Sequence, residues 1–226
     1  MEKNIIFFDL DGTLTDPMLG ITRSVQHALK AYGIIEEDLT RLIPFIGPPL
    51  KDSFMKFYDF SEEQAKEAIY KYREYFATSG LFENQVYEGI PEMLGKLKAS
   101  GKKLYVATSK PEKFARQILE HFQLDSYFDY IGGASMDEVR VRKGDVIAYT
   151  MEQAGVQDVD RSRMVMVGDR EHDVFGAKEQ GIDCVGVLFG YGSREELEAA
   201  GTWKIAADMD ELTKILMEDL WNMHNR

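Results

Sequence analysis

The stretch Ile5-Ile6-Phe7-Phe8-Asp9-Leu10-Asp11-Gly12-Thr13 decides the fold of this chain. Its apolar first half, rich in β-branched and aromatic residues, predicts a short buried strand over residues 4–8. Because strand side chains alternate, Asp9 and Asp11 project to one side, whereas Leu10 points into the core. Gly12 permits a tight turn out of the strand. Two neighbouring carboxylates repel each other, so the pair indicates either a bound divalent cation or an acidic loop after an edge strand.

Four more apolar runs have the length of strands, and most runs are separated by segments with helical spacing of apolar residues. This alternation of strands and helices implies βαβ units. It therefore predicts an α/β fold with a Rossmann-like, mostly parallel sheet covered by helices on both faces. The predicted strands span residues 4–8, 103–107, 130–133, 164–168 and 184–188.

The segment 17–88 breaks this rhythm because it contains helical patterns and no convincing strand. Ser61 and Gln64 have the spacing of a capping box at the start of a helix. The loop Gly47-Pro48-Pro49 interrupts the helices. We therefore expect two domains, a core formed by residues 1–16 and 89–226 and an inserted helical cap formed by residues 17–88.

Composition excludes several classes of protein. The 226 residues include 39 Asp and Glu against 27 Lys and Arg, a net charge of −12, which argues against a nucleic acid polymer as partner. The single cysteine, Cys184, excludes an internal disulfide and a Cys-based zinc site and is expected to be a small buried apolar residue. No run reaches the ~20 apolar residues of a membrane span, and the N-terminus does not read as a signal peptide. A cytoplasmic protein without a membrane partner is expected.

Two more predicted strands end in polar residues. Asp169 follows the strand 164–168, and Asp173, four residues later, shares its face if a helix begins there. Thr108 and Ser109 follow the strand 103–107 and offer hydroxyl and backbone N–H groups to an anion. Because sites in open α/β sheets form beyond the carboxyl ends of the strands, we expect carboxylates and phosphate ligands at one edge.

With these motifs in this order, the chain resembles phosphatases of the haloacid dehalogenase superfamily that carry a helical cap after the first motif. The resemblance covers essentially the whole chain. It departs from the family where Gly144 and Asp145 replace prolines that often follow the lysine of the third motif. The four matches are Asp9-Leu10-Asp11-Gly12-Thr13, then Thr108, then Lys143, and finally Gly168-Asp169 with Asp173.

The resemblance implies a role for each matched residue. Asp9 would be the nucleophile and Asp11 the general acid and base, while Thr108 and Lys143 would bind the transferring phosphoryl group. Arg142 and Lys110 are rivals of Lys143 for this role. Mg²⁺ would be held by Asp9, the backbone carbonyl of Asp11, and Asp169, with Asp173 as a further ligand or as a residue that orients Lys143. Phosphate binding would also involve Gly12, Thr13 and Ser109, and substrate binding in the cap would involve Gly47 and Lys51.

Within the family, the carboxylate of Asp11 sets aside the dehalogenase and phosphonate-hydrolase branches, which lack it. A phosphomonoester hydrolase for a small organic phosphate is therefore expected. The loop 47–50 and the stretch 188–193 resemble phosphoglycolate-phosphatase-like enzymes and a bacterial 5′-nucleotidase group. The alternatives are a sugar phosphomutase similar to β-phosphoglucomutase and a catalytically idle regulator that binds phosphate or a partner. The sequence leaves open whether the chain is a monomer or a dimer.

Overall fold

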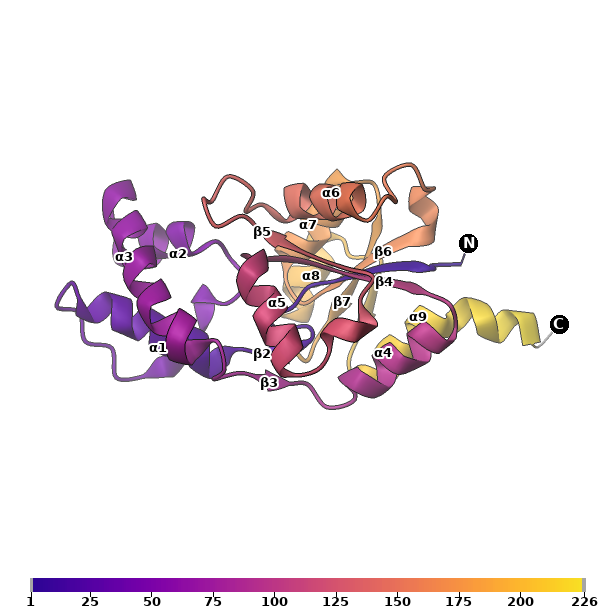
Figure 1. Cartoon of the computed structure of the whole chain (residues 1–226), viewed down its shortest axis with the longest axis horizontal. Helices are drawn as coiled ribbons and strands as arrows, with labels where there is room; N and C mark the ends of the chain where they lie inside the picture. Colours follow the sequence, from indigo (N-terminus) through magenta and orange to yellow (C-terminus); the bar gives the residue numbers. More distant parts are fainter. Residues whose placement is uncertain (1, 225–226) are drawn as a thin grey trace. The chain divides into compact units, whose positions relative to one another are not determined.

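The computed structural model describes the backbone of residues 2–224 and the side chains of residues 2–218, and the chain divides into two compact units. The larger unit comprises residues 1–14 and 86–226, and the smaller one comprises residues 15–85. A six-stranded sheet forms the centre of the larger unit (Figure 1). Its strands are β1 (Ile5–Phe8), β4 (Lys103–Pro111), β5 (Tyr130–Ala134), β6 (Met164–Gly168), β7 (Asp183–Val187) and β8 (Lys204–Ala206).

The strand order β5-β4-β1-β6-β7-β8 places β1 in the middle of the sheet, and every neighbouring pair is parallel. Phe8, the last residue of β1, lies beside Val106 of β4 and Val167 of β6. In chain order, β4 and β5 lie on one side of β1, and β6, β7 and β8 follow on its other side. The carboxyl end of β1 is therefore the topological switch point, where open α/β sheets bind ligands.

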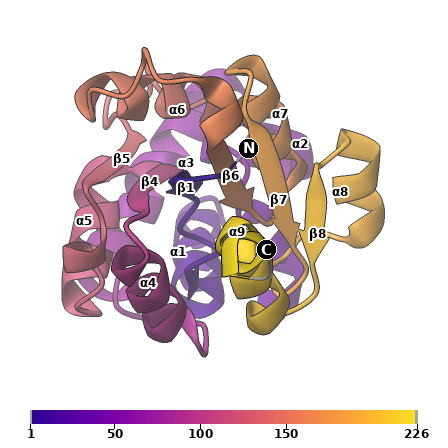
Figure 2. The ribbon, with the colours of Figure 1, turned by 90° about the vertical axis from the view of Figure 1, so that its right-hand side faces the viewer.

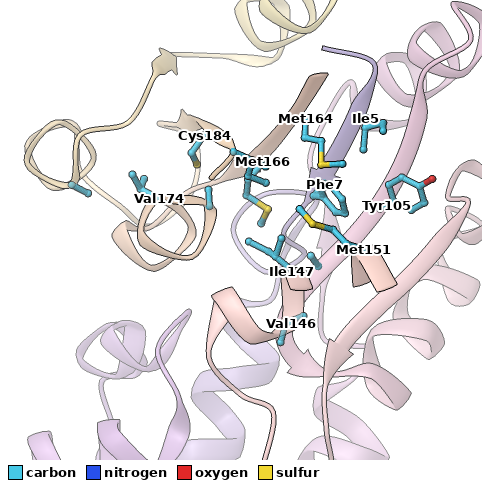
Figure 3. Packing of buried hydrophobic residues seen from close by; sticks show 14 of the residues in the cluster. Ile5, Phe7, Tyr105, Val146, Ile147, Met151, Met164, Met166, Val174 and Cys184 are labelled. Carbon is cyan, nitrogen blue, oxygen red and sulfur yellow. The ribbon is translucent and has the colours of Figure 1, made fainter. Parts of the chain in front are cut away.

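Helices cover both faces of the sheet, with α6 and α7 on one face and α4 and α9 on the other (Figure 2). In Figure 3, Phe7 lies near Met151 and Ile147 of α6, and Ile5 lies beside Met164 of β6. Phe7 and Phe8 point to opposite faces, and both are fully buried. Burial of a side chain of this size contributes about 1.5–3 kcal/mol to folding, so both faces hold the site-bearing strand in place. The helices of the larger unit are α4 (Ile90–Ala99), α5 (Glu112–His121), α6 (Lys143–Gln153), α7 (Glu171–Glu179), α8 (Arg194–Ala200) and α9 (Met209–His224).

The α/β class and the five predicted strands are confirmed, with two differences. The edge strand β8 was missed because three residues carry too little periodicity to be recognised. The predicted strand 103–107 continues to Pro111, with a shift in its pairing to β5 between Thr108 and Pro111. An irregularity of this kind turns side chains away from the regular alternation and is common beside active sites.

The smaller unit is built mainly from helices. The capping box predicted at Ser61 is present, because its Oγ accepts from the Gln64 N–H and the Gln64 side chain accepts from the Ser61 N–H. Two short strands, β2 (Thr15–Asp16) and β3 (Gln85–Val86), pair with each other, and β3 corrects the expectation that residues 17–88 contain no strand. The helices are α1 (Met18–Lys30), the 3₁₀-helix Leu39–Phe45, α2 (Leu50–Tyr58), α3 (Glu62–Tyr75) and the π-helix Phe76–Gly80.

Within the described part of the chain, no helix combines the length and the apolar character that crossing a bilayer requires.

Candidate active site

The first motif lies directly beyond β1. The Asp9 N–H donates to the carbonyl of Val167 at 2.9 Å, which continues the pairing of β1 with β6 by one residue. Leu10 is fully buried, as predicted, whereas Asp9 and Asp11 keep 6% and 9% of their surface exposed. The chain then turns at Gly12, whose φ of +82° lies in the left-handed region that favours glycine. A Cβ at Gly12 would also collide with the Asp169 carboxylate. Glycine is therefore required here for two independent reasons.

The fourth motif lies beyond β6, next to the first. Asp169 follows the strand directly, and α7 begins two residues later, so that Asp173 lies in its first turn. One oxygen each of Asp9, Asp169 and Asp173 lies within 4.8 Å of the other two. Burial, followed by the nearby Asp173 carboxylate, raises the pKa of Asp169 well above its usual value. The repulsion among these buried carboxylates requires positive charge at this point.

Lys143 supplies part of that charge. Its Nζ lies 2.7 Å from Oδ1 of Asp9 and 2.8 Å from Oδ1 of Asp173, and it donates to the carbonyl of Ala107 at 3.2 Å. Burial disfavours the charged amine, but the two carboxylates outweigh it and raise the pKa of Lys143 above its usual value. Between Lys143 and its rival Arg142, the geometry favours Lys143, because Arg142 pairs with Glu179 on the surface instead.

Lys110 holds a second ion pair, which the sequence analysis did not predict. Its Nζ lies 2.5 Å from Oδ2 of Asp11, and both side chains are buried. Burial raises the pKa of Asp11, and the Lys110 charge opposes that rise. From the sequence, Lys110 is expected only as a substitute for Lys143. The extension of β4 beyond residue 107 explains the difference, because it brings Lys110 back to the end of β1.

The remaining phosphate-binding candidates of the larger unit are placed by β4 and by the turn at Gly12. Thr108 is buried, and its Oγ1 accepts from the Lys110 N–H at 3.2 Å. Ser109 is half-buried. Thr13 is fully buried, and within the described residues its Oγ1 has no hydrogen-bond partner.

A glycine-rich loop after β7 also takes part in the site. Tyr191 donates its backbone N–H to Oδ2 of Asp169 at 2.7 Å. A Cβ on Gly190 would collide with the Asp169 side chain and the Gly12 carbonyl, and one on Gly192 would collide with the Asp169 carbonyl. From the sequence, residues 188–193 indicate only a resemblance to related phosphatases, and no contact with Asp169 is predicted. The spacing Gly-Tyr-Gly after a buried strand was the signal that the backbone approaches a neighbour closely.

Gly47 and Lys51 belong to the smaller unit. Gly47 has a φ of +103°, which explains glycine at this turn. Lys51 is half-buried, and its Nζ lies 2.9 Å from Oε2 of Glu62. The assignment of both residues to substrate binding stays a prediction.

The carboxylates fit a hard divalent cation. Oδ1 of Asp169 is buried and has no hydrogen-bond partner among the described residues, while Oδ2 is occupied by the Tyr191 N–H. An oxygen of this kind costs free energy unless a cation or a water meets it. The three converging carboxylates offer oxygen ligands, which Mg²⁺ prefers.

Comparisons with known proteins agree with this geometry. Residues 6–187 match the family model described as haloacid dehalogenase-like hydrolase. The chain is 48% identical over 211 residues to a 5′-nucleotidase of Pseudomonas aeruginosa, covering 93% of this chain and 94% of that protein. It is 41% identical to the tyrosine-protein kinase PtkA of Mycobacterium tuberculosis, covering 95% of this chain and 73% of that protein.

A solved structure extends the likeness to three dimensions. A predicted phosphatase from Clostridium acetobutylicum superposes with a TM-score of 0.93 at 49% identity, covering 96% of this chain and all of that one. The family model, the relatives and the carboxylates gathered beyond β1 and β6 lead to one conclusion. The chain belongs to the haloacid dehalogenase-like hydrolase family and is a phosphatase.

Proposed function

We propose that this chain is a Mg²⁺-dependent phosphomonoester hydrolase for a small organic phosphate, foremost a 5′-nucleotide, and that it works through an aspartyl-phosphate. The observation that carries the proposal is the convergence of Asp9, Asp169 and Asp173 on one point, with Lys143 bridging two of them. The 48% identity to a 5′-nucleotidase over nearly the full length supports the substrate class. Phosphoglycolate is the second substrate proposed.

Asp9 is the nucleophile in this proposal. Lys143 faces Oδ1 of Asp9, which leaves the second carboxylate oxygen to attack phosphorus. The new bond joins that oxygen to phosphorus while the bond from phosphorus to the ester oxygen breaks.

Asp11 moves the proton. It protonates the departing ester oxygen, and it then takes a proton from the water that attacks the aspartyl-phosphate, which releases inorganic phosphate and restores Asp9. Lys110 holds Oδ2 of Asp11, so the other oxygen is the one that exchanges the proton. That oxygen, Oδ1, has no hydrogen-bond partner among the residues described.

Thr108 and Lys143, together with Gly12, Thr13 and Ser109, would bind the oxygens of the phosphoryl group. Positioning and neutralisation of charge provide most of the catalysis in phosphoryl transfer. Asp9, the backbone carbonyl of Asp11, Asp169 and Asp173 would hold Mg²⁺. When bound, Mg²⁺ would supply positive charge to the phosphoryl oxygens and would offset the repulsion among the carboxylates.

The unit 15–85 would act as a cap that selects the organic part of the substrate, through Gly47 and Lys51. The ion pair of Lys51 with Glu62 does not withhold Lys51 from a substrate anion, because both side chains reach solvent and surface pairs contribute only about 0–1 kcal/mol. The proposed partner is thus a small phosphomonoester rather than a nucleic acid polymer or a membrane. A cytoplasmic location and a monomeric or dimeric state stay predictions.

One screen tests the proposed function. Release of inorganic phosphate is measured with Mg²⁺ from nucleoside 5′-monophosphates, phosphoglycolate and β-glucose 1-phosphate, with the Asp9→Asn protein as a control for contaminating phosphatases. Fastest release from a 5′-nucleotide is expected. Conversion of β-glucose 1-phosphate to glucose 6-phosphate without release would identify a mutase instead. A protein that binds phosphate but turns over none of the three classes would be a binding module.

Removal of the metal is expected to abolish turnover. A chelator should stop phosphate release, and added Mg²⁺ should restore it. Asp169→Asn should raise the Mg²⁺ concentration for half-maximal activity more than about 100-fold, because it removes a ligand rather than a residue behind one. Asp158→Asn, which removes an exposed carboxylate, should leave that concentration unchanged. Full turnover in excess chelator would refute the metal assignment.

A further inference from the structure

Asp169 and Asp173 lie on one short segment, residues 168–173, which turns from β6 into α7. Both side chains must keep a fixed orientation if they are to bind a cation. Lys143 and the Arg170 N–H hold the two oxygens of Asp173, with Nζ 2.8 Å from Oδ1 and the N–H donating to Oδ2 at 3.1 Å. The orientation of Asp173 therefore depends on the backbone at Arg170. A contact that fixes the backbone at Arg170 therefore also fixes the carboxylate of Asp173.

Glu196 of α8 contacts this segment from the side. Its Oε1 accepts from Nε of Arg170 at 2.8 Å and from the backbone N–H of Glu171 at 2.9 Å. The side chains of Glu196 and Arg170 are 21% and 19% exposed, so the ion pair is largely shielded from water. One carboxylate oxygen thus holds both the side chain that follows Asp169 and the first residue of α7.

A simpler role for Glu196 would be to cap its own helix. Ser193 and Glu196 have the spacing of a capping box, and the Ser193 hydroxyl does accept from the Glu196 N–H at 3.1 Å. In a capping box, however, the glutamate carboxylate turns back to its own helix start. Here its Oε1 is directed across to α7 instead. The carboxylate therefore acts between elements, which helix capping does not require.

The loop after β7 packs closely against the same segment. The backbone N–H of Tyr191 donates to Oδ2 of Asp169, and a Cβ on Gly192 would collide with the Asp169 carbonyl. The loop leads directly into α8, which carries Glu196. Residues 168–173 are thus held by the loop at Asp169 and by Glu196 at the start of α7.

We propose that Glu196 is a positioning residue for metal binding. By fixing Arg170 and the Glu171 N–H, it holds the turn from β6 to α7 in the conformation that directs the oxygens of Asp169 and Asp173 at the cation. This inference rests on the metal of the proposed function. It adds a residue that lies outside the carboxylate cluster.

The test measures metal binding by the full-length protein without substrate, by calorimetry with Mg²⁺ and by electron paramagnetic resonance with Mn²⁺. Glu196→Ala is expected to raise the dissociation constant about 10–100-fold, the usual effect of losing a residue that orients metal ligands. At saturating Mg²⁺ the variant should recover kcat to within a few-fold of the wild-type value. Glu196→Gln keeps an acceptor oxygen for the Glu171 N–H, so a smaller rise of the dissociation constant is expected. This variant replaces Glu196→Ala in the test if the alanine variant fails to fold.

Two further variants separate positioning from a simple loss of negative charge. Glu195→Ala removes the same charge one residue away, from an exposed position on the same helix, and should change the dissociation constant less than about two-fold. Arg170→Met removes positive charge, so an effect of charge alone would tighten metal binding. Positioning predicts weaker metal binding instead. It also predicts that the double variant Glu196→Ala/Arg170→Met has a dissociation constant no higher than that of whichever single variant binds the metal more weakly.

Unchanged metal binding in Glu196→Ala would overturn the inference, and so would equal losses in Glu195→Ala or tighter binding in Arg170→Met. The phosphate-release screen is independent of these measurements. A protein whose Mn²⁺ binding depends on Glu196 in this way, yet which hydrolyses no phosphomonoester, would overturn the proposed activity and keep this inference. A wild-type protein that binds neither Mg²⁺ nor Mn²⁺ would overturn both the inference and the metal assignment.

Discussion

Asp9→Asn is expected to lower phosphate release by at least about 10⁴-fold with every substrate, because it removes the proposed nucleophile, on which every later step depends. The amide oxygen of asparagine can still accept from Lys143, which lies 2.7 Å from Oδ1 in the wild-type protein, so the fold should survive. Phosphate release and thermal unfolding of the same preparation check both statements. Activity within about 100-fold of the wild-type level would show that Asp9 is not the nucleophile.

Asp11→Asn is expected to give a loss that depends on the leaving group. Loss of proton transfer usually costs about 10²–10⁴-fold, and a nucleoside alkoxide should show that full loss. p-Nitrophenolate leaves without a proton, so Asp9 should still be phosphorylated, but the variant then lacks the base proposed for hydrolysis. The aspartyl-phosphate should accumulate, and mass spectrometry of acid-quenched protein should show one added phosphoryl group. If Asp9→Asn instead carries the added phosphoryl group and Asp11→Asn does not, the roles of nucleophile and general acid and base are assigned to the wrong residues.

The sequence was sufficient to predict five of the six described strands of the sheet and the carboxylates that follow two of them, because both depend on local patterns. A buried strand is apolar throughout, and the polar residue that follows it lies at the carboxyl edge of the sheet. Asp9 and Asp169 each follow such a strand, and the parallel pairing of β1 with β6 brings them together. Lys143 was identified by its position at the start of a helix within the family pattern, and its Nζ does reach Asp9.

The interactions that the sequence could not predict depend on where side chains meet across the fold. Lys110 reaches Asp11 only because β4 continues past its apolar run, and no local pattern indicated that extension. Glu196 has the spacing of a helix cap, and only the packing of α8 beside α7 shows its other role. Contacts of this kind join residues 26 or 99 positions apart, and spacing along the chain carries no information about them.

Charge balance explains why the site needs these lysines before any cation or substrate arrives. Asp9, Asp11, Asp169 and Asp173 are all buried, and a buried carboxylate without a counter-charge costs several kcal/mol. Lys143 lies between two of them, and Lys110 pairs with a third. Asp169 has its Tyr191 N–H but no lysine within the described residues at ion-pair distance. A metal cation would therefore complete the balance at Asp169.

Lys143→Met is accordingly expected to lower the free energy of unfolding by about 3–5 kcal/mol in the absence of metal, the usual cost of breaking a buried ion pair by removing one partner. The methionine fills a similar volume, so the loss reports charge rather than a cavity. Chemical denaturation measures it. Added Mg²⁺ should stabilise this variant more than the wild-type protein, because the cation replaces part of the missing charge. Turnover at saturating Mg²⁺ should still fall about 10²–10³-fold, since the proposed role of Lys143 also includes binding the phosphoryl oxygens.

Lys3→Met is the matched control for this prediction. Lys3 is also buried and also pairs with an aspartate, Asp183, at 2.5 Å. The Asp183 side chain is 43% exposed, however, so water can solvate it once the lysine is gone. Lys3→Met should therefore cost less stability than Lys143→Met, should leave turnover unchanged and should gain nothing extra from Mg²⁺. Equal losses of stability in the two variants, with no difference in their response to Mg²⁺, would mean that Lys143 supports the fold without serving the carboxylates of the site.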